Sequence, residues 1–424
     1  DKPLTNAIND NISDYKDTVP HLFHHAAIVM LTNGEQTKFG TITSGYEHFH
    51  EWKRVREDDE PSDDPRIPLN GVMEKTRLLD IVENFTMFDD SSGELRKILA
   101  KNHQYFGVNR TIRAIECKEE LEGKLGVFWH TQGSGKSYSM VFLTRKVHRK
   151  ISGSYTFVIV TDRKDLDEQI YTTFAGCGVA NDERDPCRAK SGENLKELLA
   201  LRKTHVFTVI NKFNQNGPYT TRDDVIVISD EAHRTQYGLL ALNMRNALPN
   251  AGFLGFTGTP LMRGDEKTRL IFGNYVSRYD FHQAVIDEAT VPLYFDSRGS
   301  KLKVNVDDVN EIVAEAIEEM GLEDDEINAL EKALGKNYHV MTKPDRLEDI
   351  ARDIVEHYSR TFGSGKAMLV CLDKLTCMKM EALIQRFWQD KISELETDKE
   401  MVVDPWDLVN INERISWMQE TLIA

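Results

Sequence analysis

The sequence predicts an α/β fold built around a parallel β-sheet. Short apolar runs of the kind found in buried strands alternate with stretches whose apolar residues recur at helical spacing. The runs are 125–129, 156–160, 206–210, 225–229 and 253–257. A glycine-rich turn joins the first of these runs to a helical stretch, as in sheets that bind ligands where strands meet helices.

Composition narrows the class of protein. The chain has 424 residues, enough for two or three domains of about 100–200 residues each. A net charge of −16 is unlike that of a protein that coats DNA, although a motor can confine positive charge to one groove. No apolar run reaches the ~18 residues of a membrane span, so we expect no membrane partner. The five cysteines are scattered and lack CxxC spacing, which indicates a reducing cytosol and no structural zinc.

The N-terminal part predicts a small β structure followed by a break. Residues 26–32 and 36–43 flank Asn33-Gly34, a dipeptide typical of hairpin turns. The acidic, proline-broken segment 57–65 indicates a linker. Because the chain starts at Asp1 without a methionine or a signal-like apolar segment, we expect it to be part of a longer protein.

From about residue 300 the composition changes. Residues 307–336 are acidic and helix-prone, which favours a solvated helical face, or alternatively a surface that repels DNA or docks on a basic partner. A helix over 345–360 then leads to the apolar run 367–372, which predicts the first strand of a second α/β domain. The Gly-Ser-Gly-Lys of 363–366 precedes that run and lacks a following hydroxyl, so we interpret it as a turn.

A glycine-rich segment between a strand and a helix is typical of a phosphate-binding loop. The segment consists of His130, Thr131, Gln132, Gly133, Ser134, Gly135, Lys136 and Ser137. In such a loop, backbone N–H groups close around phosphate oxygens, the lysine reaches the terminal phosphates and the last hydroxyl holds magnesium. The pattern therefore predicts nucleotide binding, with His130 standing where the usual pattern has its first glycine.

A second set of polar residues follows the run 225–229. Asp230 and Glu231 come directly after it, and α/β sheets place their ligands at the carboxyl ends of strands. Asp230 would hold magnesium together with Ser137, and Glu231 would orient the water that attacks the γ-phosphate. His233 completes the run Asp-Glu-Ala-His and is a candidate for coupling hydrolysis to movement. Alone this run fits a strand end and a polar turn, but paired with the phosphate loop it predicts ATP hydrolysis.

Two further strand ends carry hydroxyl groups. Thr257 and Thr259 lie where they could hydrogen-bond the carboxylate motif and transmit its state to a bound nucleic-acid strand. The alternative is a plain turn at the end of a β-strand. Thr161, Asp162 and Arg163 end an earlier strand, and their hydroxyl and basic groups suit phosphate contacts on DNA. Taken alone, the second set does not decide between a DNA contact and an ordinary loop.

In this order the motifs resemble those of the first RecA-like domain of superfamily-two helicases and translocases. More narrowly, most of the chain resembles the restriction (R) subunit of type I restriction-modification enzymes. The residues that carry this resemblance are 20–23, 49–53, 103–110, 129–137, 161–167 and 365–368. His130 fits the family, and Gln104 matches its upstream glutamine motif, which implies that Gln104 contacts adenine, a helix-surface amide being the alternative.

The resemblance implies a bacterial, cytoplasmic complex with methylation and specificity subunits. In it the R subunit uses ATP and Mg²⁺ to pump duplex DNA and cuts when translocation stalls. The implied domains are the C-terminal part of an endonuclease domain (1–56), a linker (57–72), the first RecA-like ATPase domain (73–290) and part of a second (291–424). We expect the nuclease residues and the later helicase motifs to lie outside this chain, which should then bind nucleotide with weak turnover. Another superfamily-two DNA or RNA helicase, or a nucleotide-gated interaction module, remains the alternative.

Overall fold

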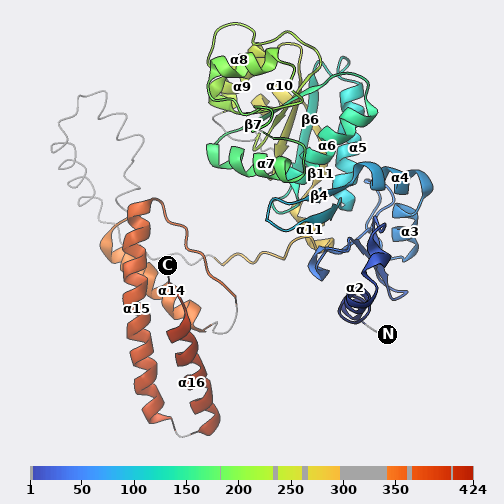
Figure 1. The fold of residues 1–424 in the computed structure, drawn as a ribbon. Coiled ribbons are helices and arrows are strands. Elements are labelled where there is room, and N and C mark those ends of the chain that lie inside the picture. The colour runs from blue at the N-terminus through green and yellow to red at the C-terminus, as the bar shows by residue number, and fades with distance from the viewer. Residues whose placement is uncertain are drawn as a thin grey trace, which may run out of the picture. The chain divides into compact units, whose positions relative to one another are not determined.

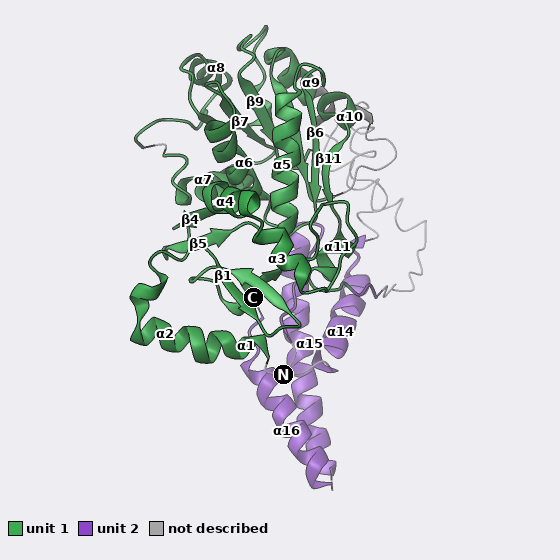
Figure 2. Cartoon of the chain, turned by 90° about the vertical axis from the view of Figure 1, so that its right-hand side faces the viewer, with its two compact units in different colours: residues 1–293 green, residues 294–424 purple. Residues whose placement is uncertain are grey.

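The computed structural model divides into two compact units, Asp1–Leu293 and Tyr294–Ala424 (Figure 1 and Figure 2). The structure describes residues 3–181, 183–232, 237–259, 266–296, 341–360, 365–402 and 404–423. Within these ranges no helix combines the length and the apolar character that crossing a membrane requires.

A six-stranded sheet in the order β11-β6-β10-β9-β7-β8 forms the centre of the first unit, and all its pairings are parallel. The strands are β6 (Lys124–His130), β7 (Thr156–Thr161), β8 (His205–Val209), β9 (Val225–Ser229), β10 (Gly252–Thr257) and β11 (Tyr275–Tyr279). The predicted α/β class with a RecA-like parallel sheet is confirmed, and all five expected strands form. The strand β11 was not predicted, because its residues Tyr-Val-Ser-Arg-Tyr contain neither a long apolar run nor a regular alternation of apolar and polar residues.

Alternate residues of each strand pack against helices on opposite faces of the sheet. On β6, Phe128 belongs to one buried core, whereas Val127 and Trp129 belong to the other. The first core is covered by α5 (Asn102–Glu116), α6 (Lys136–Lys150) and α7 (Lys164–Gly176). The second is covered by α8 (Gly192–Ala200), α9 (Tyr237–Ala247) and α10 (Glu266–Phe272), which lie together in Figure 1. This layering leaves the strand ends free to carry a site.

The N-terminal region begins with short helical turns and a small antiparallel sheet. The turns are α1 (Leu4–Asn6), η1 (Ala7–Ile12), α2 (Ser13–Thr18) and η2 (Pro20–Phe23). The sheet contains β1 (Val29–Thr32), β2 (Thr37–Gly40) and β3 (His50–Glu51), with η3 (Tyr46–His48) before the last strand. The predicted hairpin is confirmed by the antiparallel pairing of β1 with β2, and Asn33 Oδ1 accepts the backbone N–H groups of Glu35 and Gln36 in its turn.

The segment expected to be a linker is only partly irregular. Residues 57–65 contain no helix or strand, but α3 (Arg66–Val72) follows inside the expected range 57–72. Asp64 accepts the backbone N–H of Arg66 where this helix begins, and Val72 is buried. After it come α4 (Lys75–Asn84) and the hairpin of β4 (Thr86–Asp89) and β5 (Arg96–Leu99). The first unit also contains η4 (Ile210–Lys212) and α11 (Phe281–Ile286).

The secondary-structure elements described in the second unit are all helices. Its helices are α14 (Pro344–Arg360), α15 (Lys374–Met401) and α16 (Pro405–Glu420). The predicted strand over 367–372 is wrong, since these residues are unpaired and Met368 and Val370 are 87% and 77% exposed. A strand needs a neighbour for its backbone N–H and C=O groups, and the described part of this unit contains none. The acidic stretch 307–336 lies outside the described residues.

Candidate functional site

The sheet order brings the predicted motifs to one edge. β6, which carries the phosphate loop, pairs with β10, which carries the threonine turn, and β10 pairs with β9, which carries the carboxylates. Because all these strands are parallel, the residues that follow them meet at the same carboxyl edge. Three motifs that are spread over residues 130–259 of the sequence thus become neighbours.

The loop after β6 has the backbone conformation that its glycines allow. Gly133 and Gly135 have φ angles of +81° and +82°, in the left-handed region that favours glycine. Gly135 is the residue before α6, so the loop passes directly into the helix N-terminus. Ser134 is buried, and its Oγ has no hydrogen-bond partner among the described residues. The segment is therefore shaped to surround an anion with backbone N–H groups.

Lys136 turns back over this loop. Its Nζ donates to the carbonyl oxygens of His130 at 3.2 Å and Thr131 at 3.5 Å. Burial lowers the pKa of Lys136, while Asp230 and Glu231 act in the opposite direction. The ammonium group therefore lies between the loop and the two carboxylates and is held by groups that a phosphate could replace.

The carboxylates follow β9 in a strained turn. Asp230 is 9% exposed, and its backbone N–H donates to Val160 O at 2.9 Å. Glu231 has a φ of +50°, which is unfavourable for a residue with a Cβ. Ala232 N–H donates to Phe256 O at 3.0 Å, which fixes the turn against β10. Strain of this kind concentrates at functional sites and persists only where surrounding contacts enforce it.

The threonine turn after β10 lies against the loop. A Cβ at Gly258 would stand 3.2 Å from Lys136 Nζ and 3.6 Å from the backbone nitrogen of Gln132. Thr257 is fully buried, and its Oγ1 donates to the carbonyl of Thr259 at 3.1 Å, closing the turn. The structure thus places Gly258, which lies between Thr257 and the exposed Thr259, next to the lysine. His233 lies outside the described residues.

The remaining predicted set lies further away. β7, which ends at Thr161, is separated from β6 by β9 and β10. Thr161 Oγ1 donates to Arg163 O at 3.2 Å, so this hydroxyl closes its own loop. Arg163 is the residue before α7, and its side chain is 66% exposed and 3.9 Å from Asp162 Oδ2. Of this set, the structure leaves Arg163 best placed for a large anionic partner.

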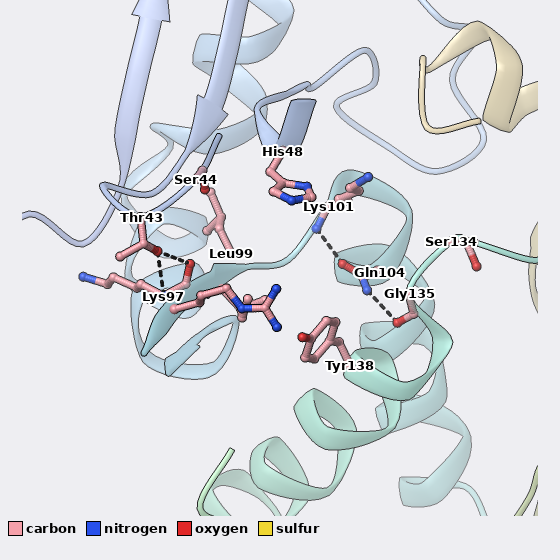
Figure 3. A pocket seen from close by; sticks show the side chains of 13 residues that line it. Thr43, Ser44, His48, Lys97, Leu99, Lys101, Gln104, Ser134, Gly135 and Tyr138 are labelled. Carbon is pink, nitrogen blue, oxygen red and sulfur yellow. Dashed lines mark hydrogen bonds between the residues drawn. The ribbon is translucent and has the colours of Figure 1, made fainter. Parts of the chain in front are cut away.

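The first turn of α5 braces the phosphate loop. Gln104 Nε2 donates to Gly135 O at 2.9 Å, and Gln104 Oε1 accepts from Lys101 N at 2.8 Å, as the dashed lines in Figure 3 show. His103 Nε2 lies 2.9 Å from Ser134 O. Gln104 is 4% exposed, so it is not the helix-surface amide considered above. An amide has two donors and two acceptor sites, so one of each remains on Gln104.

A cavity of about 220 Å³ lies beside the loop (Figure 3). Gln104, Gly135 and Tyr138 line it, together with Thr43 and His48 of the N-terminal region. The loop therefore opens onto a space with both aromatic and polar walls, part of it supplied by residues that precede the parallel sheet.

Three residues that shape this site were not predicted from the sequence. His103 stands inside the run that carries the family resemblance, and Tyr138 directly follows the loop, so position in the sequence could have indicated both. Tyr138 Oη donates to the buried Asp89 at 2.6 Å. Ser277 contacts His130 at 2.9 Å from β11, and it gave no signal because that strand was not recognised.

Comparison with known families agrees with this arrangement. The sequence pattern of the SWI2/SNF2 ATPases matches residues 103–326, more than half of the chain. The chain belongs to the SWI2/SNF2 ATPase family. Membership in an ATPase family implies ATP as the cofactor, and the matched region contains the loop, the carboxylates and the threonine turn.

The resemblance to type I restriction endonuclease subunits is also confirmed. The HindI endonuclease subunit of Haemophilus influenzae is 35% identical over 418 residues, covering 90% of this chain and 39% of that protein. A Methanocaldococcus jannaschii protein, provisionally named the MjaIXP endonuclease subunit of a type I restriction enzyme, is 31% identical over 410 residues, covering 88% of this chain and 38% of that protein. The chain thus spans about two fifths of the length of these relatives. A fragment structure from Vibrio vulnificus YJ016, provisionally named an HsdR subunit of a type I restriction enzyme, covers 93% of this chain and 62% of its own at 14% identity, with a TM-score of 0.41.

Proposed function

We propose that the chain is the ATP-driven motor portion of the endonuclease subunit of a type I restriction enzyme and that it moves duplex DNA. The observation that carries the proposal is the adjacency of the phosphate loop, the carboxylates and the threonine turn on neighbouring strands of one sheet. The homology to type I endonuclease subunits supports duplex DNA, rather than RNA, as the substrate. Residues 1–56 would then be the C-terminal part of a nuclease domain and residues 291–424 part of a second RecA-like domain.

The residues at the loop fit a magnesium nucleotide. The positive φ angles of Gly133 and Gly135 open the backbone, and the unpaired Ser134 Oγ adds a donor. Lys136 would exchange its two carbonyl contacts for phosphate oxygens. The hydroxyl of Ser137 and the carboxylate of Asp230 would hold magnesium, which neutralises charge on the phosphates when bound.

The other predicted residues take roles around this centre. Glu231 would accept a hydrogen bond from the attacking water and orient it. Thr257 and Thr259, which flank Gly258 beside the lysine, would report the state of the site to bound DNA, as would His233. In the cavity of Figure 3, the free donor and acceptor of Gln104 would meet the edge of the adenine base. Thr161, Asp162 and Arg163 would contact the DNA backbone, Arg163 most directly.

The remaining parts of the proposal concern the complete enzyme. Methylation and specificity subunits would be its partners, because the resemblance to type I restriction enzymes implies that a specificity subunit recognises the DNA site. When translocation stalls, the duplex would be cut by nuclease residues that we expect outside this chain, in a bacterial cytoplasm. A lone motor segment without the arginine that a second RecA-like domain supplies should turn over slowly, since such an arginine contributes a factor of about 10³–10⁵.

The test is ATP hydrolysis by the full-length protein with its partner subunits, measured with and without duplex DNA that carries their recognition site. We expect stimulation by duplex DNA that Lys136→Ala abolishes. Lys366→Ala is the matched control, because it alters the exposed lysine of the second Gly-Ser-Gly-Lys run. Turnover that ignores duplex DNA would refute the proposal, and ATP-dependent strand separation would favour another superfamily-two helicase instead.

A further inference from the structure

A carboxylate in the irregular segment after β3 reaches the core of the motor. The side chain of Glu57 is 17% exposed, although it belongs to an acidic stretch that composition assigns to a solvated linker. Its Oε2 pairs with Arg110 Nε of α5 at 2.5 Å, and its Oε1 accepts the hydroxyl of Ser277 at 3.0 Å. The neighbouring Asp58 pairs with the same arginine at 2.6 Å but is 84% exposed. Only Glu57 of these two continues inward.

Ser277 bridges Glu57 and the phosphate loop. It is 1% exposed on β11, and its Oγ lies 2.9 Å from Nε2 of His130, the residue in the unusual first position of the loop. A serine hydroxyl has one proton, and a carboxylate beside an arginine accepts only. Ser277 therefore donates to Glu57 and must accept from His130. The proton of the neutral imidazole is then on Nε2, and Nδ1 is the unprotonated nitrogen.

His130 lies between the contact with Ser277 and the rest of the phosphate loop. Its ring is fully buried, and the centroid of the ring lies 4.0 Å from that of Phe128 and 5.3 Å from that of His103. His103 in turn holds Ser134 O of the loop, and the carbonyl of His130 itself accepts from Lys136 Nζ. A rotation of the imidazole would therefore change its packing against His103, the residue that contacts Ser134 O of the loop. Burial keeps the pKa of His130 well below its ordinary value, so the ring is neutral.

We propose that Glu57 is a positioning residue of the phosphate loop, which acts through Ser277 to fix the tautomer and orientation of His130. The proposal rests on the proposed function in that it assigns the loop to nucleotide binding. It connects the segment between the N-terminal region and the motor to the first residue of the loop. Movement of that segment would change the affinity of the loop for nucleotide without any contact between Glu57 and the ligand.

Glu57→Gln gives a specific consequence. Arg110 can only donate, so it holds the amide oxygen of the new side chain and turns the NH₂ group toward Ser277. Ser277 then accepts from the amide and donates to His130 Nε2. The imidazole proton moves to Nδ1, and the tautomer inverts. Ser277→Ala removes both hydrogen bonds and leaves the ring without this constraint.

The experiment uses the 424-residue chain with ¹⁵N-labelled histidine. The two-bond ¹H–¹⁵N spectrum distinguishes the tautomers, and the signals of His130 among the 13 histidines are assigned with a His130→Asn variant. The same samples are titrated with a fluorescent ATP analogue, and thermal unfolding confirms that each variant is folded. Asp58→Asn is the matched control, since it removes the other carboxylate from Arg110 without touching Ser277.

We expect Glu57→Gln to invert the tautomer and to weaken nucleotide binding by about 5- to 13-fold, the upper part of the range for one hydrogen bond. Ser277→Ala should weaken it similarly, whereas Asp58→Asn should stay within about twofold of wild type. An unchanged His130 spectrum in Glu57→Gln would overturn the inference, and so would an inverted tautomer with wild-type affinity. If wild type binds no nucleotide, the proposed function fails, and the His130 spectra alone then decide whether Glu57 sets the tautomer.

Discussion

Gly107→Ala tests how closely α5 packs against the strand that carries the phosphate loop. Helix propensity alone predicts that alanine stabilises a helix interior by about 0.5–1 kcal/mol relative to glycine. At this position a Cβ would stand 2.6 Å from two ring atoms of Phe128 and 2.8 Å from Ser277 Oγ. Phe128 is fully buried and is also stacked on Phe256 at 4.5 Å, so it has little room to move.

The packing cost should therefore exceed the gain in propensity. Overpacking of a rigid core costs about 1–3 kcal/mol, and contacts this short belong at the upper end. We expect a net loss of about 1–2 kcal/mol, which for a unit of this size lowers Tm by about 2–4 °C per kcal/mol. Nucleotide affinity should fall as well, because Phe128 and Ser277 both contact His130.

The assay is thermal unfolding monitored by circular dichroism, with nucleotide titration of the same samples. The double variant Gly107→Ala/Phe128→Leu is the control, since it removes the ring atoms that the new methyl would meet. Its loss of stability should be smaller than the sum of the two single losses, as expected for residues in contact. A rise in Tm for Gly107→Ala alone would show that helix propensity decides the outcome and would refute the close approach.

Three further variants address the loop, the carboxylates and the hairpin beside them. Gly135→Ala adds a Cβ 2.7 Å from Gln104 Nε2 at a φ of +82°, so we expect affinity for a fluorescent ATP analogue to fall by about tenfold or more, and an affinity within twofold of wild type would contradict the loop geometry. Glu231→Gln keeps size and backbone but removes the carboxylate, so DNA-stimulated ATPase of the full-length protein should fall by about 10²–10⁴-fold with nucleotide affinity unchanged, and retained turnover would exclude this role. Tyr138→Phe removes the donor to Asp89 and should cost about 1–2 kcal/mol in denaturant unfolding near neutral pH. Burial alone would raise the pKa of Asp89, but hydrogen bonds from Tyr138 and Ser91 lower it, so this difference should shrink as the pH falls through the folded pKa of the carboxyl group, and a difference independent of pH would contradict it.

Much of the first unit could be predicted because its signals are local. The strand before His130 is an apolar run, the loop has its glycines at fixed spacing, and the helix after it has a clear apolar face. Each of these properties depends on a few consecutive residues. The carboxylates after β9 were found for the same reason, and parallel strands then require both motifs to meet at one edge.

What the sequence could not supply depends on pairing between distant segments. β11 has neither a long apolar run nor a regular alternation, and it forms because β6 offers it a parallel partner. Ser277 of β11 and His130 of β6 are 147 residues apart in sequence. The run 367–372 shows the opposite case, with strand-like residues that have no partner strand in the described part of their unit. Strand formation depends on a neighbour as much as on composition, and composition is all that a local pattern records.

The same reasoning explains why Glu57 looks unimportant in the sequence. An acidic, proline-containing segment ordinarily remains in solvent, and Asp58 does so. Glu57 leaves solvent because β11 places Ser277 beside His130 and α5 places Arg110 where it can neutralise the carboxylate. A buried carboxylate without such partners would be costly, so its position reports a specific requirement of the fold. The N-terminal region also lines the cavity beside the loop. Glu57 thus reaches, through Ser277, the residue His130 that stands where the usual loop pattern has its first glycine.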